Sequence, residues 1–211
     1  MQTIGLFGGT FDPVHYGHLR TALELRYRLA LDEVRFLPCA IPPHRDMPTA
    51  SAAIRLRMLR AAVDSEPGFL VDERELERAG PSYSVDTLLS LRADYPQASL
   101  CLLLGMDAFL GLPTWRAWRE LLRLGHIVVA HRPGSRMPAD GELGELLHRC
   151  GTRTSTELKR SLAGRVHVQE VTQLEISSTE LRASIRAGMP ASYLVPAAVC
   201  NIIMETGCYA A

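Results

Sequence analysis

The sequence has no excess of either charge, because 23 basic residues balance 23 acidic ones. Proteins that bind nucleic acid or a membrane surface over a broad face usually carry a basic excess. The balance therefore argues against both of these partners. A nucleotide needs only a few local positive groups, so a nucleotide-binding protein remains compatible with this composition.

Paired cysteines are also missing. The chain has five cysteines, an odd number, and no two of them form a C-x-x-C pair. Such spacing indicates neither a zinc site nor a disulfide framework. We expect buried or incidental thiols in a reducing compartment, at Cys39, Cys101, Cys150, Cys200 and Cys208.

Long apolar runs are the third absence. No stretch approaches the ~20 apolar residues of a membrane span, and the N-terminal MQTIGLFGG has neither the basic start nor the apolar core of a signal peptide. We therefore expect a cytoplasmic protein. Its 211 residues, 47% of them hydrophobic, suffice for a single domain over 1–211. The oligomeric state stays open, with a homo-oligomer as one option.

What the sequence does contain is an alternation of short apolar runs and amphipathic segments. This pattern implies an α/β fold, a doubly wound parallel sheet with helices on both faces and a small helical region near the C-terminus, at about 176–211. Strands are expected at 2–7, 33–38, 69–77, 99–107, 126–134 and 165–171. Helices are expected at 18–31, 52–65, 81–96, 113–124, 140–150, 156–164, 177–188 and 196–207.

The residues with unusual chemistry gather near the ends of these strands. Ligands of parallel sheets bind outside the carboxyl ends of the strands. We therefore expect the clusters of glycine, histidine, proline and serine to converge on one edge of the sheet, from the segments 8–18, 38–46, 105–115, 131–134 and 177–182.

The first cluster is GGTFDPVHYGH, residues 8–18. It matches neither the G-x-G-x-x-G dinucleotide fingerprint nor a P-loop. Gly8 and Gly9 let the backbone approach a ligand closely, and the helix that follows points its positive end back at the loop. His15 and His18 are placed to hydrogen-bond phosphate oxygens. Zinc is the rival ligand, but two histidines are too few and no Cys or Asp is spaced to complete the set.

The last cluster is ISSTELR, residues 176–182. Ser177 or Ser178 can cap a helix whose exposed N–H groups bind anionic oxygens, and Arg182 follows one turn later, where a guanidinium can hold a phosphate through two bonds. A simple capping box between Ser177 and Glu180 explains the same residues without a ligand. Taken alone, this segment favours the simple capping box.

Three further segments carry candidate binding residues. Asp107 ends the most apolar strand, where a carboxylate suits ribose hydroxyls or caps a helix. Trp115 can stack on a flat aromatic ring, whereas Trp118 suits packing within a helix. Arg132 follows the fifth expected strand and either contacts phosphate or adenine or lies on the surface.

GGTFDPVHYGH and ISSTELR together resemble the T/H-x-G-H and ISSTxxR signatures of the nucleotidyltransferase superfamily. They lie about 160 residues apart, as in the nicotinate-nucleotide adenylyltransferases, and the segments PPHR, DERELERAGPSYSVDTL, GMD, PTW and HRPG between them are similar to that family as well. The resemblance covers almost the whole chain. It implies a Rossmann-like fold and transfer of AMP from ATP to nicotinate mononucleotide, giving deamido-NAD and pyrophosphate, with Mg²⁺ carried by ATP.

The resemblance also implies roles for individual residues. The catalytic residues would be Thr10, His15 and His18. The ATP-binding positions would be Gly8, Gly9, Phe11, Gly105, Asp107, Arg132, Ile176, Ser177, Ser178, Thr179 and Arg182. The acceptor would be bound by His44, Arg45, Tyr83, Ser84, Thr87 and Trp115, with Trp115 stacked on the pyridine ring. Tyr83, Ser84 and Thr87 stand at an expected helix start, which favours an anion but also occurs in helices without ligands.

Two positions depart from the family's pattern. His44 stands where relatives often have lysine, and Cys39 where they often have asparagine. The proline-rich loop 38–48 is a candidate lid. Two other functions stay open: an adenylyltransferase acting on nicotinamide mononucleotide or phosphopantetheine, and a non-catalytic nucleotide-binding regulator. The presence of both histidines together with Arg182 argues against the regulator.

Overall fold

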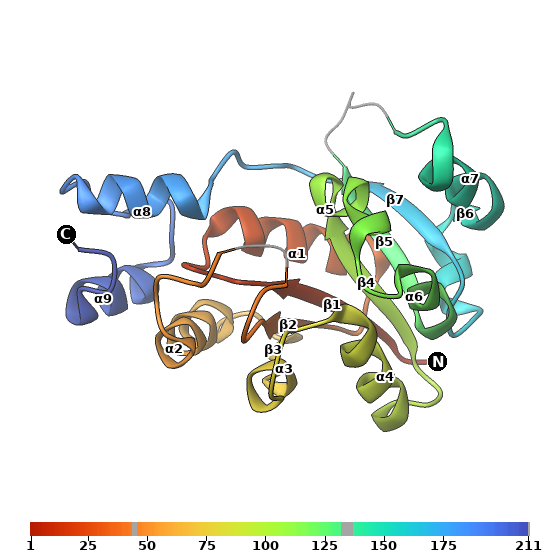
Figure 1. Cartoon of the computed structure of the whole chain (residues 1–211), viewed down its shortest axis with the longest axis horizontal. Coiled ribbons are helices and arrows are strands. Elements are labelled where there is room, and N and C mark those ends of the chain that lie inside the picture. The colour runs from red at the N-terminus through yellow and green to blue at the C-terminus, as the bar shows by residue number, and fades with distance from the viewer. Residues whose placement is uncertain (44–45, 132–136, 211) are drawn as a thin grey trace.

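The computed structural model describes residues 1–43, 46–131 and 137–210. Their strands form one sheet in the order β3-β2-β1-β4-β5-β7-β6, and all neighbouring strands are parallel (Figure 1). The strand order reverses between β1 and β4, so the sheet is doubly wound, as the sequence predicts. The strands are β1 (Thr3–Gly9), β2 (Glu33–Pro38), β3 (Phe69–Val71), β4 (Ser99–Gly105), β5 (His126–His131), β6 (Gly151–Thr152) and β7 (Val166–Glu170).

Helices cover both faces of this sheet. In β4, Leu102 and Leu104 pack into one core cluster, while Cys101 and Leu103 pack into the other. The face that carries Cys101 and Leu103 is covered by α1 (Tyr16–Leu29), α2 (Ala52–Val63) and α9 (Ala197–Thr206). The face that carries Leu102 and Leu104 is covered by α4 (Ser84–Asp94), α5 (Met106–Leu110), α6 (Trp118–Leu124) and α7 (Gly141–Cys150). A sheet buried on both faces explains why its central strands β1 and β4 are almost uniformly apolar.

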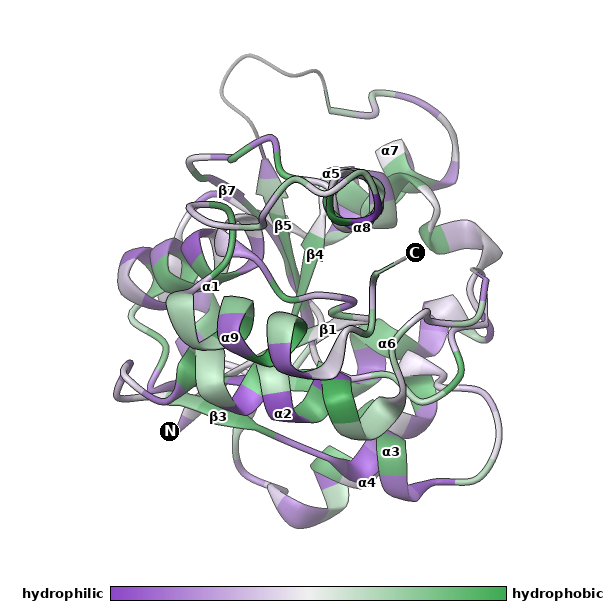
Figure 2. Cartoon of the chain, turned by 90° about the vertical axis from the view of Figure 1, so that its left-hand side faces the viewer, coloured by the Kyte–Doolittle hydropathy of each residue, from purple (hydrophilic) through white to green (hydrophobic). Residues whose placement is uncertain are grey.

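The C-terminal helical region consists of α8 (Ser178–Arg186) and α9. Figure 1 shows both helices at one end of the molecule, reached from β7 by an extended segment. α9 packs against α2, and Figure 2 views this end of the molecule with α8 and α9 in front. The fold therefore returns the last part of the chain to the neighbourhood of its first loop.

Two expected strands are shorter than the apolar pattern indicated. The strand expected at 69–77 ends at Val71, because the carboxylate of Asp72 accepts hydrogen bonds from the backbone and side chain of Arg74 and so starts α3 (Arg74–Glu77). The strand expected at 99–107 ends at Gly105, which is the N-cap residue of α5.

Two expected helices are also wrong in part. The helix expected at 113–124 is a 3₁₀ turn, η1 (Leu112–Thr114), followed by α6, because Ala117 is left-handed with φ 50° and separates them. The helix expected at 156–164 is only the 3₁₀ turn η2 (Ser155–Lys159). There the hydroxyl of Ser99 donates to the carbonyl of Leu158 at 2.6 Å, so that carbonyl is held by β4. The short strand β6 was not predicted.

None of the helices in the described ranges combines the length and the apolar character that a membrane-crossing helix requires.

Candidate active site

The glycine-rich turn lies at the carboxyl end of β1, in the middle of the sheet. Pro38 pairs with Gly9 at the end of β2 on one side of β1. On the other side, the pairing of β1 with β4 stops at Leu6 and Leu102, although the strands continue to Gly9 and Gly105. The turn therefore borders the point where the strand order reverses, which is where doubly wound sheets hold ligands.

His15 and His18 lie together at the start of α1. His15 is the N-cap residue of the helix, and the ring centroids of the two histidines are 3.7 Å apart in a stacked arrangement. Gly17 makes this packing possible, because a Cβ there would lie 3.0 Å from the His15 ring and 3.3 Å from the carbonyl oxygen of Leu174. The spacing H-x-G-H thus has a steric cause as well as a chemical one.

The two imidazoles differ in their hydrogen bonds and in exposure. The backbone N–H of His15 donates to Nδ1 of His18 at 3.3 Å, so a neutral His18 carries its proton on Nε2. The side chain of His15 is buried, with 5% of its surface exposed, and its Nδ1 has no partner among the described residues. Burial lowers the pKa of His15 to about 4. His15 is therefore neutral near pH 7 and has a ring nitrogen that is not bonded to the protein.

The two motifs recognised in the sequence are joined by hydrogen bonds. The Ser178 hydroxyl donates to the carbonyl of Pro13 at 3.0 Å, and Arg182 Nη1 donates to the carbonyl of Asp12 at 2.7 Å. Ser177 caps α8, as expected, by accepting a hydrogen bond from the backbone N–H of Glu180. The first loop and the start of α8 therefore form one structure. Arg182 is partly committed to that junction and is not a free cation.

Asp12 is a connecting residue that the sequence analysis left without a role. Its buried carboxylate accepts hydrogen bonds from the backbone of Thr49 at 2.7 Å and Ala50 at 3.1 Å, and from the hydroxyl of Tyr209 at 2.6 Å. Burial and the Asp12 carboxylate raise the pKa of Tyr209. The acidic residue inside the first motif was a signal that could have been used, whereas nothing in the sequence pointed to Tyr209.

The expected ATP side also includes the end of β4 and the residues before α8. Gly105 is exposed and has open space where a Cβ would be, and Asp107 is exposed in the first turn of α5. Thr10 is half-buried, and its hydroxyl accepts a hydrogen bond from the Cys39 thiol at 3.6 Å. Ile176 packs against the core cluster that contains α1.

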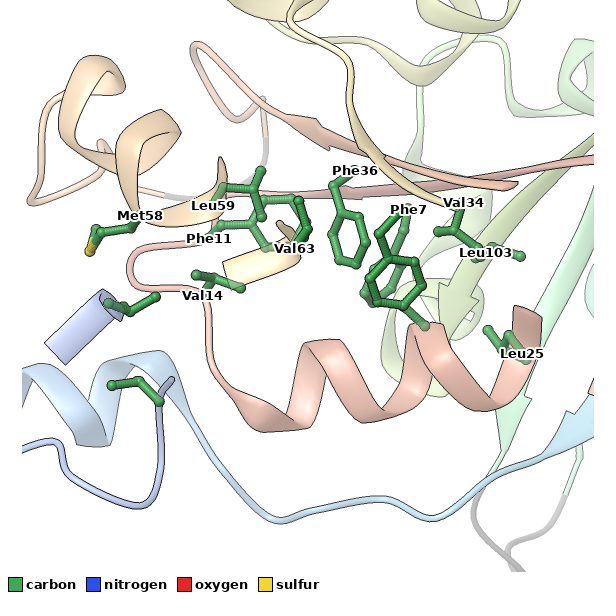
Figure 3. Close-up of a cluster of buried hydrophobic side chains, with 14 of the residues drawn as sticks. Phe7, Phe11, Val14, Leu25, Val34, Phe36, Met58, Leu59, Val63 and Leu103 are labelled. Carbon is green, nitrogen blue, oxygen red and sulfur yellow. The ribbon is translucent and has the colours of Figure 1, made fainter. Parts of the chain in front are cut away.

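Two expected binding residues have buried side chains. Phe11 is 2% exposed, and its ring lies among Phe7, Phe36 and the apolar side chains of α2 (Figure 3). Thr87 is buried, and its hydroxyl donates to Glu75 at 2.7 Å. Phe11 can therefore meet a nucleotide only through its main chain, and Thr87 supports the start of α4 from inside.

Of the residues expected on the acceptor side, Tyr83, Ser84 and Thr87 lie at the start of α4. Tyr83 is the N-cap residue and Ser84 the first residue of this helix. The Arg116 guanidinium lies 4.7 Å from the centroid of the Tyr83 ring, and Tyr83 and Trp115 pack against the same core cluster. Trp115 is half-buried, whereas Trp118 is buried in the core, as its expected packing role requires.

Three expected site residues, His44, Arg45 and Arg132, lie outside the described residues. Within the described ranges, no group of three or more His, Cys, Asp or Glu side chains could hold a metal ion. The arrangement thus offers hydrogen-bond donors, two imidazoles and a helix N-terminus at one edge of the sheet, which is a set suited to phosphate groups.

Comparison with known proteins agrees with this geometry. The Cytidylyltransferase-like family matches residues 6–184. A Methylococcus capsulatus protein named "Probable nicotinate-nucleotide adenylyltransferase" is 49% identical over 98% of this chain and 99% of its own length. A protein of the same name from Aeromonas salmonicida is 46% identical over 99% of this chain and 97% of its own.

The fold is also found among solved structures. The Plasmodium falciparum nicotinic acid mononucleotide adenylyltransferase complexed with NaAD superposes with a TM-score of 0.74 at 13% identity, covering 99% of this chain and 98% of that one. At this identity the likeness concerns the fold alone. By its sequence relatives, the chain belongs to the Cytidylyltransferase-like family and, within it, to the nicotinate-nucleotide adenylyltransferases.

Proposed function

We propose that this protein transfers AMP from ATP to nicotinate mononucleotide, giving deamido-NAD and pyrophosphate in NAD biosynthesis. The observation that carries the proposal is the junction of the two motifs, in which Ser178 and Arg182 bond the main chain of Pro13 and Asp12 beside the two histidines. The names of the full-length relatives support the same reaction and the same acceptor.

The reaction is a direct displacement. A phosphate oxygen of the acceptor attacks the α-phosphorus of ATP, the bond from that phosphorus to the bridging oxygen breaks, and pyrophosphate leaves with the electron pair. No covalent enzyme intermediate is needed. Such chemistry depends on alignment of the nucleophile and leaving group and on stabilisation of negative charge on the phosphate oxygens.

The site residues divide this work between them. His18 donates from Nε2 to the phosphates near the reacting centre, and His15 contributes from the ring nitrogen that the protein leaves unbonded. Thr10, Gly8 and Gly9 position the same phosphates, largely through the main chain. Ser177, Ser178, Thr179 and Arg182 hold the leaving pyrophosphate at the start of α8, where the helix dipole favours an anion.

The two nucleosides contact different segments of the site. The adenosine of ATP contacts Gly105 and Asp107 beyond β4, with Arg132, Ile176 and the main chain of Phe11. The acceptor's pyridine carboxylate binds at the N-terminus of α4, near Tyr83 and Ser84. Trp115 stacks on the ring, and His44 and Arg45 approach its phosphate. Thr87 acts indirectly, through its hydrogen bond to Glu75.

We further propose that Mg²⁺ enters as part of the substrate, bound to the triphosphate of ATP, where it neutralises charge on the leaving group. Residues 1–211 would act as one catalytic unit, because the C-terminal helices bond directly to the first loop.

A pyrophosphate-release assay tests the function. The purified protein is given MgATP with nicotinate mononucleotide, nicotinamide mononucleotide or phosphopantetheine in parallel reactions. We expect the highest kcat/KM with nicotinate mononucleotide. A preference for either other acceptor would replace the proposed substrate. Binding of ATP without release in any of the three reactions would indicate a non-catalytic regulator.

A further inference from the structure

Arg55 of α2 is an arginine in an unusual environment. It is 1% exposed and lies on the helix face that also buries Met58 and Leu59. Its Nη1 donates to the carbonyl of Thr10 at 2.7 Å and its Nη2 to the carbonyl of Cys39 at 2.9 Å, while Nε has no partner. Among the described residues, no carboxylate forms an ion pair with it. A charged residue on an apolar helix face was a signal that the sequence analysis missed.

The two carbonyls place this charge at the candidate active site. Thr10 follows β1 and Cys39 follows β2, and these strands are neighbours whose ends pair at Gly9 and Pro38. The guanidinium therefore bridges the carboxyl ends of two central strands, directly beneath the glycine-rich turn. A buried cation without a counter-ion is costly to fold, and an anionic ligand above the turn would supply the missing charge.

The bond to Thr10 also sets the direction of a peptide group. In a planar trans peptide the C=O and N–H point in opposite directions. With the Thr10 carbonyl held by Arg55, the N–H of Phe11 points away from the guanidinium, and it bonds to no described residue. Phe11 is left-handed, with φ 50°, a conformation that costs an L-residue about 1–2 kcal/mol. The buried Phe11 ring and the bond from Arg55 together hold it.

We propose that Arg55 is a positioning residue for the triphosphate: it orients the Thr10–Phe11 peptide so that the Phe11 N–H binds a phosphate oxygen, and its charge strengthens that binding. This inference rests on the proposed function, because it takes the ligand of the turn to be the triphosphate of ATP.

Arg92 of α4 provides a matched control. It also donates only to carbonyls: those of Ala98 at 2.6 Å, Leu124 at 2.7 Å and Leu162 at 2.9 Å, and at longer distances those of Tyr95 and Pro96. These residues precede β4, β5 and β7, so Arg92 lies at the opposite end of the sheet. Loss of Arg92 removes at least as many bonds to main-chain carbonyls as loss of Arg55, without touching the turn.

The test compares Arg55→Met and Arg55→Lys with Arg92→Met. For each protein, the affinity for inorganic tripolyphosphate is measured by calorimetry without any acceptor, beside the melting temperature and the kcat and KM for ATP. We expect Arg55→Met to bind tripolyphosphate at least tenfold more weakly, the scale of a lost charge-assisted contact. Arg55→Lys keeps the charge but cannot hold both carbonyls, so it should recover part of the affinity and keep a lowered kcat.

Arg92→Met should lower the melting temperature and leave the tripolyphosphate affinity and kcat within about twofold of the original protein. The proposal is overturned if Arg55→Met binds tripolyphosphate normally, or if Arg92→Met weakens binding as much. If Arg55→Met does not fold, normal binding and normal kcat in Arg55→Lys overturn it instead. A failure of the proposed function looks different: Arg55 would still control tripolyphosphate binding, but no acceptor would release pyrophosphate.

Discussion

Strand β5 carries a buried histidine at each end, and the two histidines differ in the hydrogen bonding of their ring nitrogens. His126, at the amino end, bonds through both ring nitrogens, with the carbonyl of Ser161 at 3.0 Å and the backbone N–H of Arg165 at 3.0 Å. His131, at the carboxyl end, has no hydrogen-bond partner for either nitrogen among the described residues. His15, at the same edge of the sheet as His131, also has an unbonded nitrogen.

The two backbone-binding arginines repeat this contrast. Arg92 uses all three of its nitrogens on carbonyls at the amino end, whereas Arg55 has an unbonded Nε at the carboxyl end. A folded protein normally satisfies its buried polar groups, so exceptions need an explanation. Among the described residues, six have such an exception, and three of them, His15, Arg55 and His131, lie at the edge where a doubly wound sheet binds its ligand. The other three, Thr3, Arg26 and Ser161, lie away from this edge.

The largest expected effect concerns His18. His18→Ala should lower kcat by roughly 10²–10³-fold, the scale for loss of one donor to a transition-state oxyanion. His167→Ala, on the part of β7 nearest the amino edge, should leave kcat unchanged in the folded protein. Pyrophosphate release under saturating substrates measures both. A near-normal rate in folded His18→Ala protein would contradict a catalytic role for His18 at the carboxyl edge of the sheet.

The two histidines of β5 allow a matched test of stability. His126→Ala leaves the Arg165 N–H and the Ser161 carbonyl without their partner, whereas His131→Ala breaks no bond to a described residue. Because the residue removed is the same, we expect His126→Ala to cost about 2 kcal/mol more free energy of unfolding than His131→Ala. Denaturant unfolding gives both values. Equal losses would contradict the contrast between the two ends.

The buried His15 makes stability depend on pH. Its pKa is about 4 in the folded protein against 6.5 when unfolded, so the unfolded chain takes up more protons as the pH falls between these values. Linkage then predicts a loss of about 2 kcal/mol of unfolding free energy from pH 7 to pH 5. His15→Asn should remove this part of the slope.

Burial also lowers the pKa of His126, which makes it the internal control. The C2–H resonances of both residues are followed by NMR with and without ATP. ATP should raise the pKa of His15, because phosphate oxygens favour the imidazolium form, and leave that of His126 unchanged. Equal shifts of both residues would contradict the assignment.

The smallest effect on the reaction is expected at Trp115. Trp115→Ala should raise KM for the acceptor about tenfold, the upper end for loss of one aromatic stacking contact, with little change in stability. Trp118→Ala should do the reverse, lowering unfolding free energy by about 3 kcal/mol and leaving the KM of folded protein unchanged. An unchanged acceptor KM in Trp115→Ala would exclude the stacking.

Much of the fold was predictable because the local patterns were strong. Apolar runs such as 99–107 predict strands, and a capping residue such as Ser177 predicts the start of a helix. A parallel sheet then follows from the alternation of strands and helices. The boundaries were less predictable. The carbonyl of Leu158 accepts a hydrogen bond from Ser99, which lies 59 residues earlier in the chain, and no local sequence pattern predicts such a contact.

The same division holds for the site. The glycines, histidines and serines of the two motifs predict a phosphate site by their chemistry and spacing. That Thr87 and Phe11 are buried, and that Asp12, Arg55 and Tyr209 hold the turn, depends on which distant segments meet there.

By itself, the sequence determined the family and the alternating elements and predicted the residues of a phosphate site, because these follow from side-chain chemistry and from periods of a few residues. The tertiary structure alone decided the roles within the site: a neutral His15, an Arg182 shared with the Asp12 carbonyl, and an Arg55 without a counter-ion. The physical reason is that burial and hydrogen-bond partners set protonation and charge, and both come from residues far apart in the chain.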